Sequence, residues 1–145
     1  MTVSGTKYKG TATYVDWTPS GGTVATVLTA ESRTFEINQA AGLIDVTVRS
    51  DTAKANLTDF PAISAKIAGL DTSGTASSNQ PWDTLNISDA GTLRWGPEGT
   101  ATGFRKRTLA AIVKTKNYSS PYDGAVSWDL EFESNGGTVV LAAWP

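Results

Sequence analysis

The sequence of 145 residues contains no cysteine and no histidine. Disulfides, thiolate metal sites and cysteine nucleophiles are therefore excluded, and the side chain that most often acts as a general base is missing as well. An enzyme built from this chain would depend on Asp, Glu, Lys, Tyr or Ser alone. We therefore predict a protein that is not an enzyme and that needs no metal or other cofactor.

A basic excess and long apolar segments are also missing. The formal net charge is −2 and the pI is about 5.0, so little electrostatic attraction to phosphate backbones is expected. No apolar run approaches the ~18 residues of a membrane span, and the first ten residues contain no apolar signal core. These absences predict a protein that does not enter a membrane and that assembles in the cytoplasm.

The residues that are present favour strands and turns. Only 18% of residues are charged, and Gly, Ser, Thr, Val and Ala dominate, which predicts a mostly β fold in a single domain over residues 1–145. Strands are predicted at Lys7 to Asp16, Thr23 to Leu28, Ser32 to Gln39, Leu43 to Arg49, Phe60 to Leu70, Gly91 to Pro97, Phe104 to Lys116, Gly124 to Ser134 and Thr138 to Trp144.

Turn signals predict how these strands pair. Ala41-Gly42 suggests a hairpin between the third and fourth strands, and Asn135-Gly136-Gly137 predicts a hairpin between the last two. A short helix is expected from Pro81 to Asn86, with Asn79 as a possible cap. A helical turn capped by Asp51 is also predicted for Asp51 to Asp59.

Three acidic residues in the penultimate strand are spaced by two, so they share one face of it. They are Asp129, Glu131 and Glu133, and the apolar Trp128, Leu130 and Phe132 alternate with them. A glycosidase pair or a Ca²⁺ site is one interpretation, but this spacing is more typical of a solvated outer face. If that face lines a channel, its carboxylates, together with Asp45, form an acidic wall that repels phosphate.

Two further features have both a chemical and a structural interpretation. The glycine-rich residues 96–103 precede three basic residues, but they lack the Gly-Lys-Ser/Thr ending of a phosphate-binding loop, so a β-turn connection is predicted. Of the five tryptophans, Trp128 is expected in the core. Trp17 and Trp144 are expected at the surface, either as interface anchors or as platforms for a sugar ring.

The order of these elements resembles that of the tail tube (major tail) proteins of long-tailed bacteriophages. The resemblance rests on TYVDWTPSGGT, on ESRTFEINQAAGLIDVTVRSD, on residues 96–137 and on the closing strand TVVLAAW. It implies a β-sandwich or β-barrel-like fold with one short flanking helix. It further implies a structural subunit that assembles into stacked hexameric rings, located in the tail of a virion, through which DNA passes during ejection. Tape measure and terminator proteins would be its other partners, and no membrane is involved.

The third and fourth strands have few of the charges, prolines or bulges that normally protect sheet edges. We therefore predict an intersubunit hairpin, with stacking through residues 51–59 and 71–79 and the terminal segments. The candidate hairpin residues are Arg33, Phe35, Ile37, Ile44, Val46 and Val48. The alternative functions are a carbohydrate-binding β-sandwich module that uses Trp17 or Trp144, and a virion neck or decoration protein of similar fold.

Overall fold

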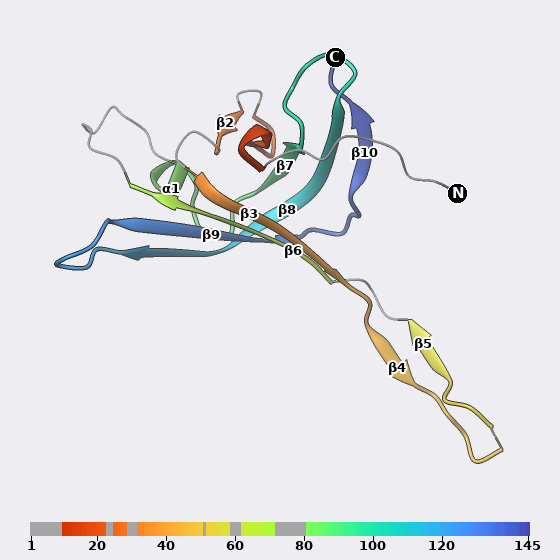
Figure 1. Ribbon diagram of the computed structural model, residues 1–145. Helices are drawn as coiled ribbons and strands as arrows, with labels where there is room; N and C mark the ends of the chain where they lie inside the picture. Colours follow the sequence, from red (N-terminus) through yellow and green to blue (C-terminus); the bar gives the residue numbers. More distant parts are fainter. Residues whose placement is uncertain (1–9, 23–24, 29–31, 51, 59–61, 72–80) are drawn as a thin grey trace.

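The computed structural model describes all residues except 1–9, 23–24, 29–31, 51, 59–61 and 72–80 (Figure 1). The described part is mostly β, as predicted. Its elements are a 3₁₀ turn at Gly10–Ala12, α1 (Pro81–Thr84), β1 (Tyr14–Pro19), β2 (Thr26–Val27), β3 (Ser32–Ala40), β4 (Leu43–Asp45), β5 (Asn56–Thr58), β6 (Ala62–Leu70), β7 (Ala90–Gly96), β8 (Arg105–Ser119), β9 (Ser127–Ser134) and β10 (Val140–Ala143).

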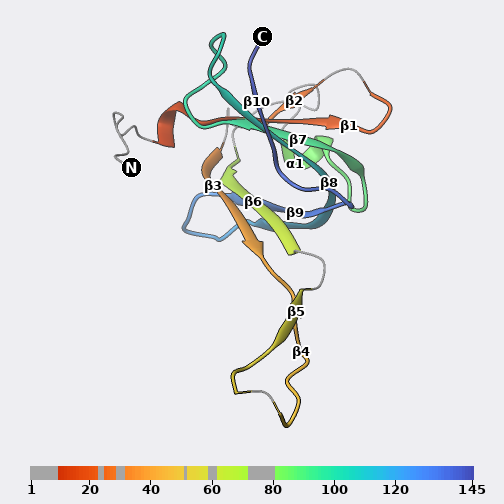
Figure 2. The ribbon, with the colours of Figure 1, turned by 90° about the vertical axis from the view of Figure 1, so that its right-hand side faces the viewer.

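One long strand, β8, joins the two halves of the main sheet. The sheet has the order β2-β1-β7-β8-β9-β6-β3, and β10 also pairs with β8. β7 pairs with β8 up to Ile112, whereas β9 pairs with it from Ala111 onward, and the register shifts between Val113 and Thr115. A bulge of this kind bends a strand. The sheet therefore folds over, and β2, β1, β7 and β10 with the start of β8 (the β1 half) face the end of β8 with β9, β6 and β3 (the β9 half; Figures 1 and 2).

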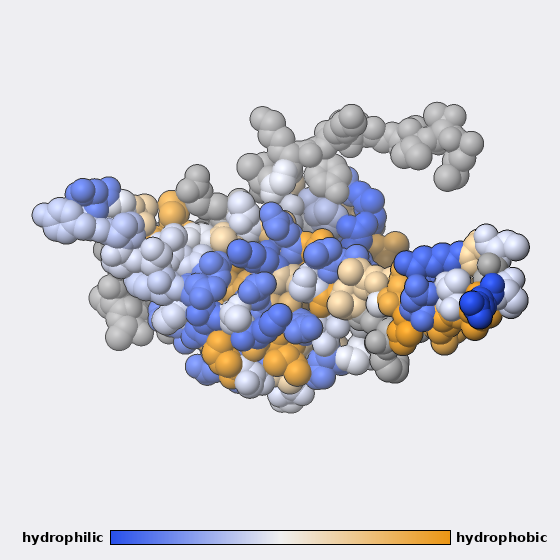
Figure 3. Space-filling view, turned by 90° about the horizontal axis from the view of Figure 1, so that it is seen from below, coloured by the Kyte–Doolittle hydropathy of each residue, from blue (hydrophilic) through white to orange (hydrophobic). Residues whose placement is uncertain are grey.

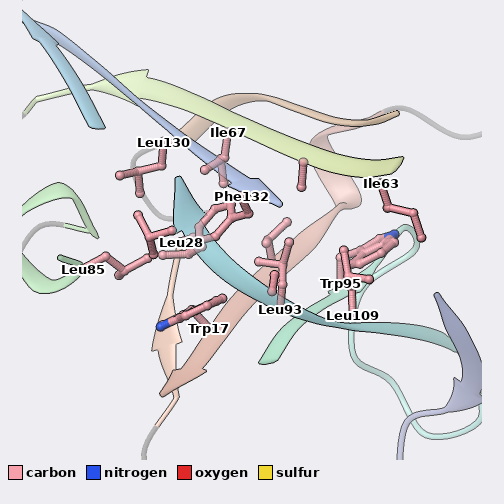
Figure 4. Close-up of a cluster of buried hydrophobic side chains, with 14 of the residues drawn as sticks. Trp17, Leu28, Ile63, Ile67, Leu85, Leu93, Trp95, Leu109, Leu130 and Phe132 are labelled. Atoms are coloured by element: carbon pink, nitrogen blue, oxygen red, sulfur yellow. The ribbon is translucent and has the colours of Figure 1, made fainter. Parts of the chain in front are cut away.

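The hydrophobic core lies between these two halves (Figure 4). Trp17 of β1 packs on Phe132 of β9 with ring centroids 5.1 Å apart, and Phe35 of β3 packs on Trp95 of β7 at 5.6 Å. Burying a large apolar side chain contributes about 1.5–3 kcal/mol. These contacts explain why the period-2 alternation of the sequence produces a sandwich.

A buried ion pair lies on the other face of the β1 half. Asp16 is fully buried, and Arg94 on the adjacent strand donates to both of its carboxylate oxygens at 2.8 and 2.6 Å. Trp144 packs over the Arg94 guanidinium at 5.4 Å. A Cβ at Gly96 would lie 2.5 Å from the Trp144 indole nitrogen, so glycine is required for this approach. The end of the chain is thereby held against the sandwich.

The predicted hairpin between β3 and β4 is wrong. β3 pairs with β6 along its whole length, and β4 pairs with β5, so the chain continues past Ala41-Gly42 instead of reversing there. The reversal lies within residues 46–55, and β4 and β5 project from the body as a two-stranded arm (Figures 1 and 2). The local turn signal was overridden because the longer ladder with β6 also buries Phe35 and Ile37 against the core.

The predicted hairpin between the last two strands is also wrong. β9 and β10 both run antiparallel to β8 and lie one after the other along its edge, with Ser134 opposite Ala111 and Val140 opposite Thr108. Gly136 has a φ of 77°, and the Asn135 backbone N–H donates to the Ala110 carbonyl. The Asn-Gly-Gly segment therefore redirects the strand along the curled sheet without reversing it.

The remaining local predictions have mixed outcomes. The short helix is confirmed at Pro81–Thr84, although it was expected to reach Asn86, and β7 pairs with β8 across the predicted β-turn connection. β1 begins only at Tyr14, and the fourth strand ends at Asp45. Residues 56–58 form β5, so the predicted helical turn is wrong there. Asn79 and most of the 71–79 loop lie outside the described residues. No helix within the described ranges is long and apolar enough to cross a membrane.

Candidate assembly surfaces

The exposed face of the β9 half is polar. The burial of β9 alternates so that Trp128, Leu130 and Phe132 face the core, and the predicted opposite face for the acidic residues is confirmed. The cross-strand register brings further charged side chains onto this polar face. Its described charged residues are Glu36, Lys66, Lys114, Asp129, Glu131 and Glu133, which is four carboxylates against two ammonium groups.

Hydrogen bonds fix the carboxylates of the polar face. The Thr115 hydroxyl donates to Glu131 and the Asn117 amide donates to Asp129, each at 2.8 Å. Lys114 lies 3.6 Å from Glu133 in an exposed ion pair, which contributes little to stability. In the described part of the chain, no three acidic, His or Cys residues are grouped as metal ligands. The arrangement is that of a net acidic surface, and the side of the body seen from below is largely hydrophilic (Figure 3).

Among the described strands, the β9 half also has two edges without a strand partner. β3 ends the strand order at one side, and at the other side the ladder between β7 and β8 ends at Ile112, which leaves the last residues of β8 paired with β9 alone. No proline lies between residues 34 and 40 or between residues 114 and 119. Such edges present a row of backbone donors and acceptors to another strand.

The candidate hairpin residues separate into two groups. Phe35 and Ile37 are half-buried in β3 and pack against the core, and Arg33 lies in the same strand with its side chain outside the described part. The others lie in the arm or just beyond β4. They are Ile44, Val46 and Val48, with exposed fractions of 51%, 39% and 60%. The apolar residues of the arm form an exposed patch (Figure 3).

Asp45 lies in the arm, away from the other three candidate lumen acids on β9. Its carboxylate accepts a hydrogen bond from the Thr47 backbone N–H at 2.9 Å. Hydrogen bonds from the Thr47 side chain and backbone lower the pKa of Asp45 below its ordinary value of 3.8. Asp45 therefore caps the turn at the end of β4.

The predicted exposure of Trp17 and Trp144 is wrong. Trp17 is 2% exposed in the core, and Trp144 is 7% exposed against Tyr14 and Arg94. β1 extends to Pro19, so Trp17 lies inside the strand instead of at the turn that follows it. Neither ring is available to stack on a sugar or to anchor a neighbour in this conformation.

The glycine-rich segment forms a connection between β7 and β8, as predicted. The Gly99 backbone N–H donates to the Gly96 carbonyl, and Gly99 has a φ of 105°. Arg105 pairs with Glu98 at 3.1 Å, so one of the three basic residues is already neutralised within the chain.

Sequence reasoning missed β5 and two charged residues of the polar face. β5 was hidden because Asn-Leu-Thr is too short to show a period, and only its ladder with β4 defines it. Glu36 and Lys66 each lie on the polar side of a strand. Their adjacency, with Lys66 opposite both Glu36 and Glu131, depends on the β3–β6–β9 strand order.

At the level of sequence, no protein-family model and no curated protein matches the chain. Solved structures do match its fold. A chain from the tail of an empty gene transfer agent particle with C6 symmetry aligns at 14% identity, a TM-score of 0.67, 94% of this chain and 100% of the other. A chain of the SPP1 tail tube aligns at 12% identity, a TM-score of 0.71, 94% of this chain and 80% of the other.

A third match comes from the baseplate of the anti-feeding prophage, with 6% identity, a TM-score of 0.60, 98% of this chain and 97% of the other. At such identities the likeness concerns the fold. The expected β-rich tail tube fold is confirmed, because the alignments cover nearly the whole chain.

Proposed function

We propose that this chain is the structural subunit of a phage-type tail tube. Copies associate side by side into rings, the rings stack, and the polar face of the β9 half lines a conduit for DNA. No catalytic step and no cofactor belong to this function. The observation that carries the proposal is a tail tube fold over nearly the whole chain, combined with two free edges on the half of the sheet that bears the polar face.

The strand directions support ring closure by edge pairing. β8, β9, β6 and β3 are antiparallel to their neighbours in turn, so β8 and β3 at the two edges run in opposite directions. Under rotational symmetry, β3 of one copy therefore meets β8 of the next copy in the antiparallel sense. Closing the ring in this way pairs the exposed backbone groups of both edges of the β9 half.

The charges of the polar face suit a polyanion that slides without binding. Asp129, Glu131 and Glu133 would repeat around the wall in every copy, and a lining of one predominant sign repels phosphate. Lys66 and Lys114 partly neutralise the surface, which reduces the repulsion between neighbouring carboxylates. The C6 symmetry of the similar gene transfer agent tail supports six copies per ring.

Further partners follow from the same proposal. Tape measure and terminator proteins would contact the lumen and the end of the tube, and the assembled protein would reside in the tail of a virion after assembly in the host cytoplasm. These assignments extend the resemblance of the sequence and are tested by co-purification with the tail of the parent particle.

Negative-stain electron microscopy over a concentration series tests the assembly. Hollow tubes or stacked rings are expected. Single rings that never stack would favour the neck or decoration protein instead. Monomers that persist at high concentration, even with a tail initiation complex present, would contradict the proposal.

A charge reversal tests the lumen assignment. Glu131→Lys with Glu133→Lys should give tubes that retain double-stranded DNA in a salt-dependent manner, because the lining then attracts phosphate. Co-sedimentation of tubes with DNA fragments measures this. The matched control is Glu98→Lys, which changes an exposed carboxylate on the β7–β8 connection. Equal DNA retention by the control and the lumen variant would refute the assignment of this face.

A further inference from the structure

The last strand, β10, has an open edge. Among the described strands it pairs with β8 alone, and it lies at the margin of the β1 half (Figure 1). The Trp144 backbone N–H donates to the Phe104 carbonyl at the end of this ladder. Because backbone direction alternates along an antiparallel ladder, the N–H and C=O groups of Leu141 and Ala143 point away from β8. These groups form a row of donors and acceptors that no described strand meets.

The open edge of β10 lacks the usual protection against strand pairing. Residues 138–144 contain no charged residue and no proline. All four residues of β10 are exposed, and Val140 and Leu141 point to opposite faces with exposed fractions of 56% and 61%. A segment of this composition at an open edge readily accepts a further strand. β10 therefore has the properties of a site for strand addition.

The charge beside β10 is positive. Arg105, Lys106 and Arg107 lie opposite β10 on β8. Glu98 pairs with Arg105 at 3.1 Å, whereas Lys106 and Arg107 have no carboxylate partner among the described residues. A strand added to β10 would lie about 10 Å from β8, two strand spacings, which a lysine and a glutamate side chain span together. Ala142, opposite Lys106, has a short side chain and leaves room for this approach.

We propose that β10 binds an extended acidic segment of another protein, which joins the sheet as a further strand. The backbone of that segment pairs with Leu141 and Ala143, and its apolar side chains cover Val140. Its carboxylates lie near Lys106 and Arg107. Because the proposed function places the polar face of the β9 half at the lumen, this site lies on the outside of the tube. Only that placement rests on the proposed function.

Two other occupants fit the site less well. Residues 1–9 contain Lys7 and Lys9 and no carboxylate side chain, so their charge is repelled by the cations beside β10. Pairing of β10 with β10 of a second copy would bring two identical basic surfaces together across a twofold axis, which a polar tube lacks. The contact proposed within a ring uses β3 and the end of β8, so it involves different residues.

Binding of a synthetic peptide to the full chain tests the charge of the partner. The probe is a short fluorescein-labelled peptide in which glutamate alternates with valine and threonine, and a peptide with lysine in place of glutamate is its control. Fluorescence anisotropy should show saturable binding of the acidic peptide and binding of the lysine peptide that is about tenfold weaker or more. Lys106→Glu with Arg107→Glu should reverse this preference.

A backbone change tests the strand addition itself. Ala143→Pro removes a donor from the open edge and keeps the hydrogen bonds between β10 and β8, so binding of the acidic peptide should fall about tenfold or more. The matched control, Ala143→Ser, keeps the donor and should bind as the unmodified chain does. An unchanged melting temperature checks that each variant folds. If Ala143→Pro melts earlier, the charge variant decides alone.

Each outcome has a defined meaning. Absence of saturable binding, equal binding of the two peptides, or full binding by a folded Ala143→Pro variant would overturn the proposed site. Dimers in sedimentation that Ala143→Pro abolishes would identify a second copy as the occupant and would also overturn it. Binding to the unassembled chain that is lost in tubes would overturn the placement on the outside. Failure of the unmodified chain to form rings would overturn the tube function, and the peptide assay would still decide on strand addition.

Discussion

The sandwich body and the β4–β5 arm are made from the same kind of alternating strand, yet they differ in what covers the apolar residues. Ile37 in β3 is half-buried against the core, whereas Ile44, seven residues later in the same extended run, is 51% exposed. The body provides both sides of its own core. The arm provides one apolar side, which the described part of the chain leaves exposed.

This difference separates residues that fold the subunit from residues that join subunits. Changes in the body should reduce the free energy of unfolding of the monomer, and changes in the arm should reduce assembly. Variants at the two places can therefore test the comparison, beginning with the largest expected effect on monomer stability.

Phe132→Ala should have the largest effect. The ring is fully buried and packs on Trp17, and removal of a core aromatic ring costs about 3–5 kcal/mol in unfolding free energy. Urea unfolding followed by tryptophan fluorescence measures this cost. Tyr122→Ala is the control, since a fully exposed ring should change stability by less than about 0.5 kcal/mol. A cost below about 1 kcal/mol for Phe132→Ala would argue against the sandwich core.

Asp16→Ala should have the next largest effect, about 3 kcal/mol, because it leaves the Arg94 guanidinium without its buried partner. The side chain of Arg94 is 32% exposed, so partial rehydration holds the cost at the lower end of the range for such pairs. Replacing both residues, by Asp16→Leu with Arg94→Met, should recover much of the loss in the same unfolding assay. No recovery in the double variant would mean that the pair itself contributes the stability.

Tyr14→Phe should have a smaller, pH-dependent effect. Burial first, and then the charge of Asp16 and a hydrogen bond to it, raise the pKa of Tyr14 above its ordinary value of 10.0. The folded protein therefore holds this proton more tightly than the unfolded chain does. The resulting stability is complete below pH 10 and falls as the pH rises above it. Thermal unfolding between pH 8 and 11 should show a shallower decline for Tyr14→Phe, and parallel curves would contradict this assignment.

Local patterns predicted the faces of the strands but not their partners. The acids of β9 fell on the exposed face because side-chain direction alternates with every residue, whatever lies next to the strand. The partners predicted for β3 and β9 were wrong because Ala41-Gly42 and Asn135-Gly136 can redirect a chain as well as reverse it. Only the ladders with β6 and β8, which join residues far apart in sequence, decide between these two outcomes.

The tryptophans show the same limit. Trp17 precedes a clear turn, which suggested exposure, but the β1–β7 ladder extends through Pro19 and keeps the ring inside. Trp144 lies beside the final residue and is buried by Tyr14 and Arg94 from distant strands. A surface position near a turn or a chain end is a reasonable local expectation, and tertiary packing overrides it in both cases.

The smallest effect on monomer stability is expected in the arm, where Ile44→Ser with Leu57→Ser should change the unfolding free energy by less than about 0.5 kcal/mol. Both side chains are more than half exposed, so little buried apolar area is lost in the monomer. The matched body variant, Ile37→Ser, should cost about 2 kcal/mol because Ile37 packs against the core.

In electron microscopy the arm variant should have the larger effect on tube formation and Ile37→Ser the smaller one. The arm variant is expected to form rings that do not stack, because stacking is predicted to involve residues 51–59 and the variant removes the apolar face of the arm. Ile37→Ser, at a temperature where it remains folded, should still form tubes, because Ile37 points into its own core. Normal tubes from the arm variant would break the comparison, since the arm would then be an exposed hairpin with no part in stacking.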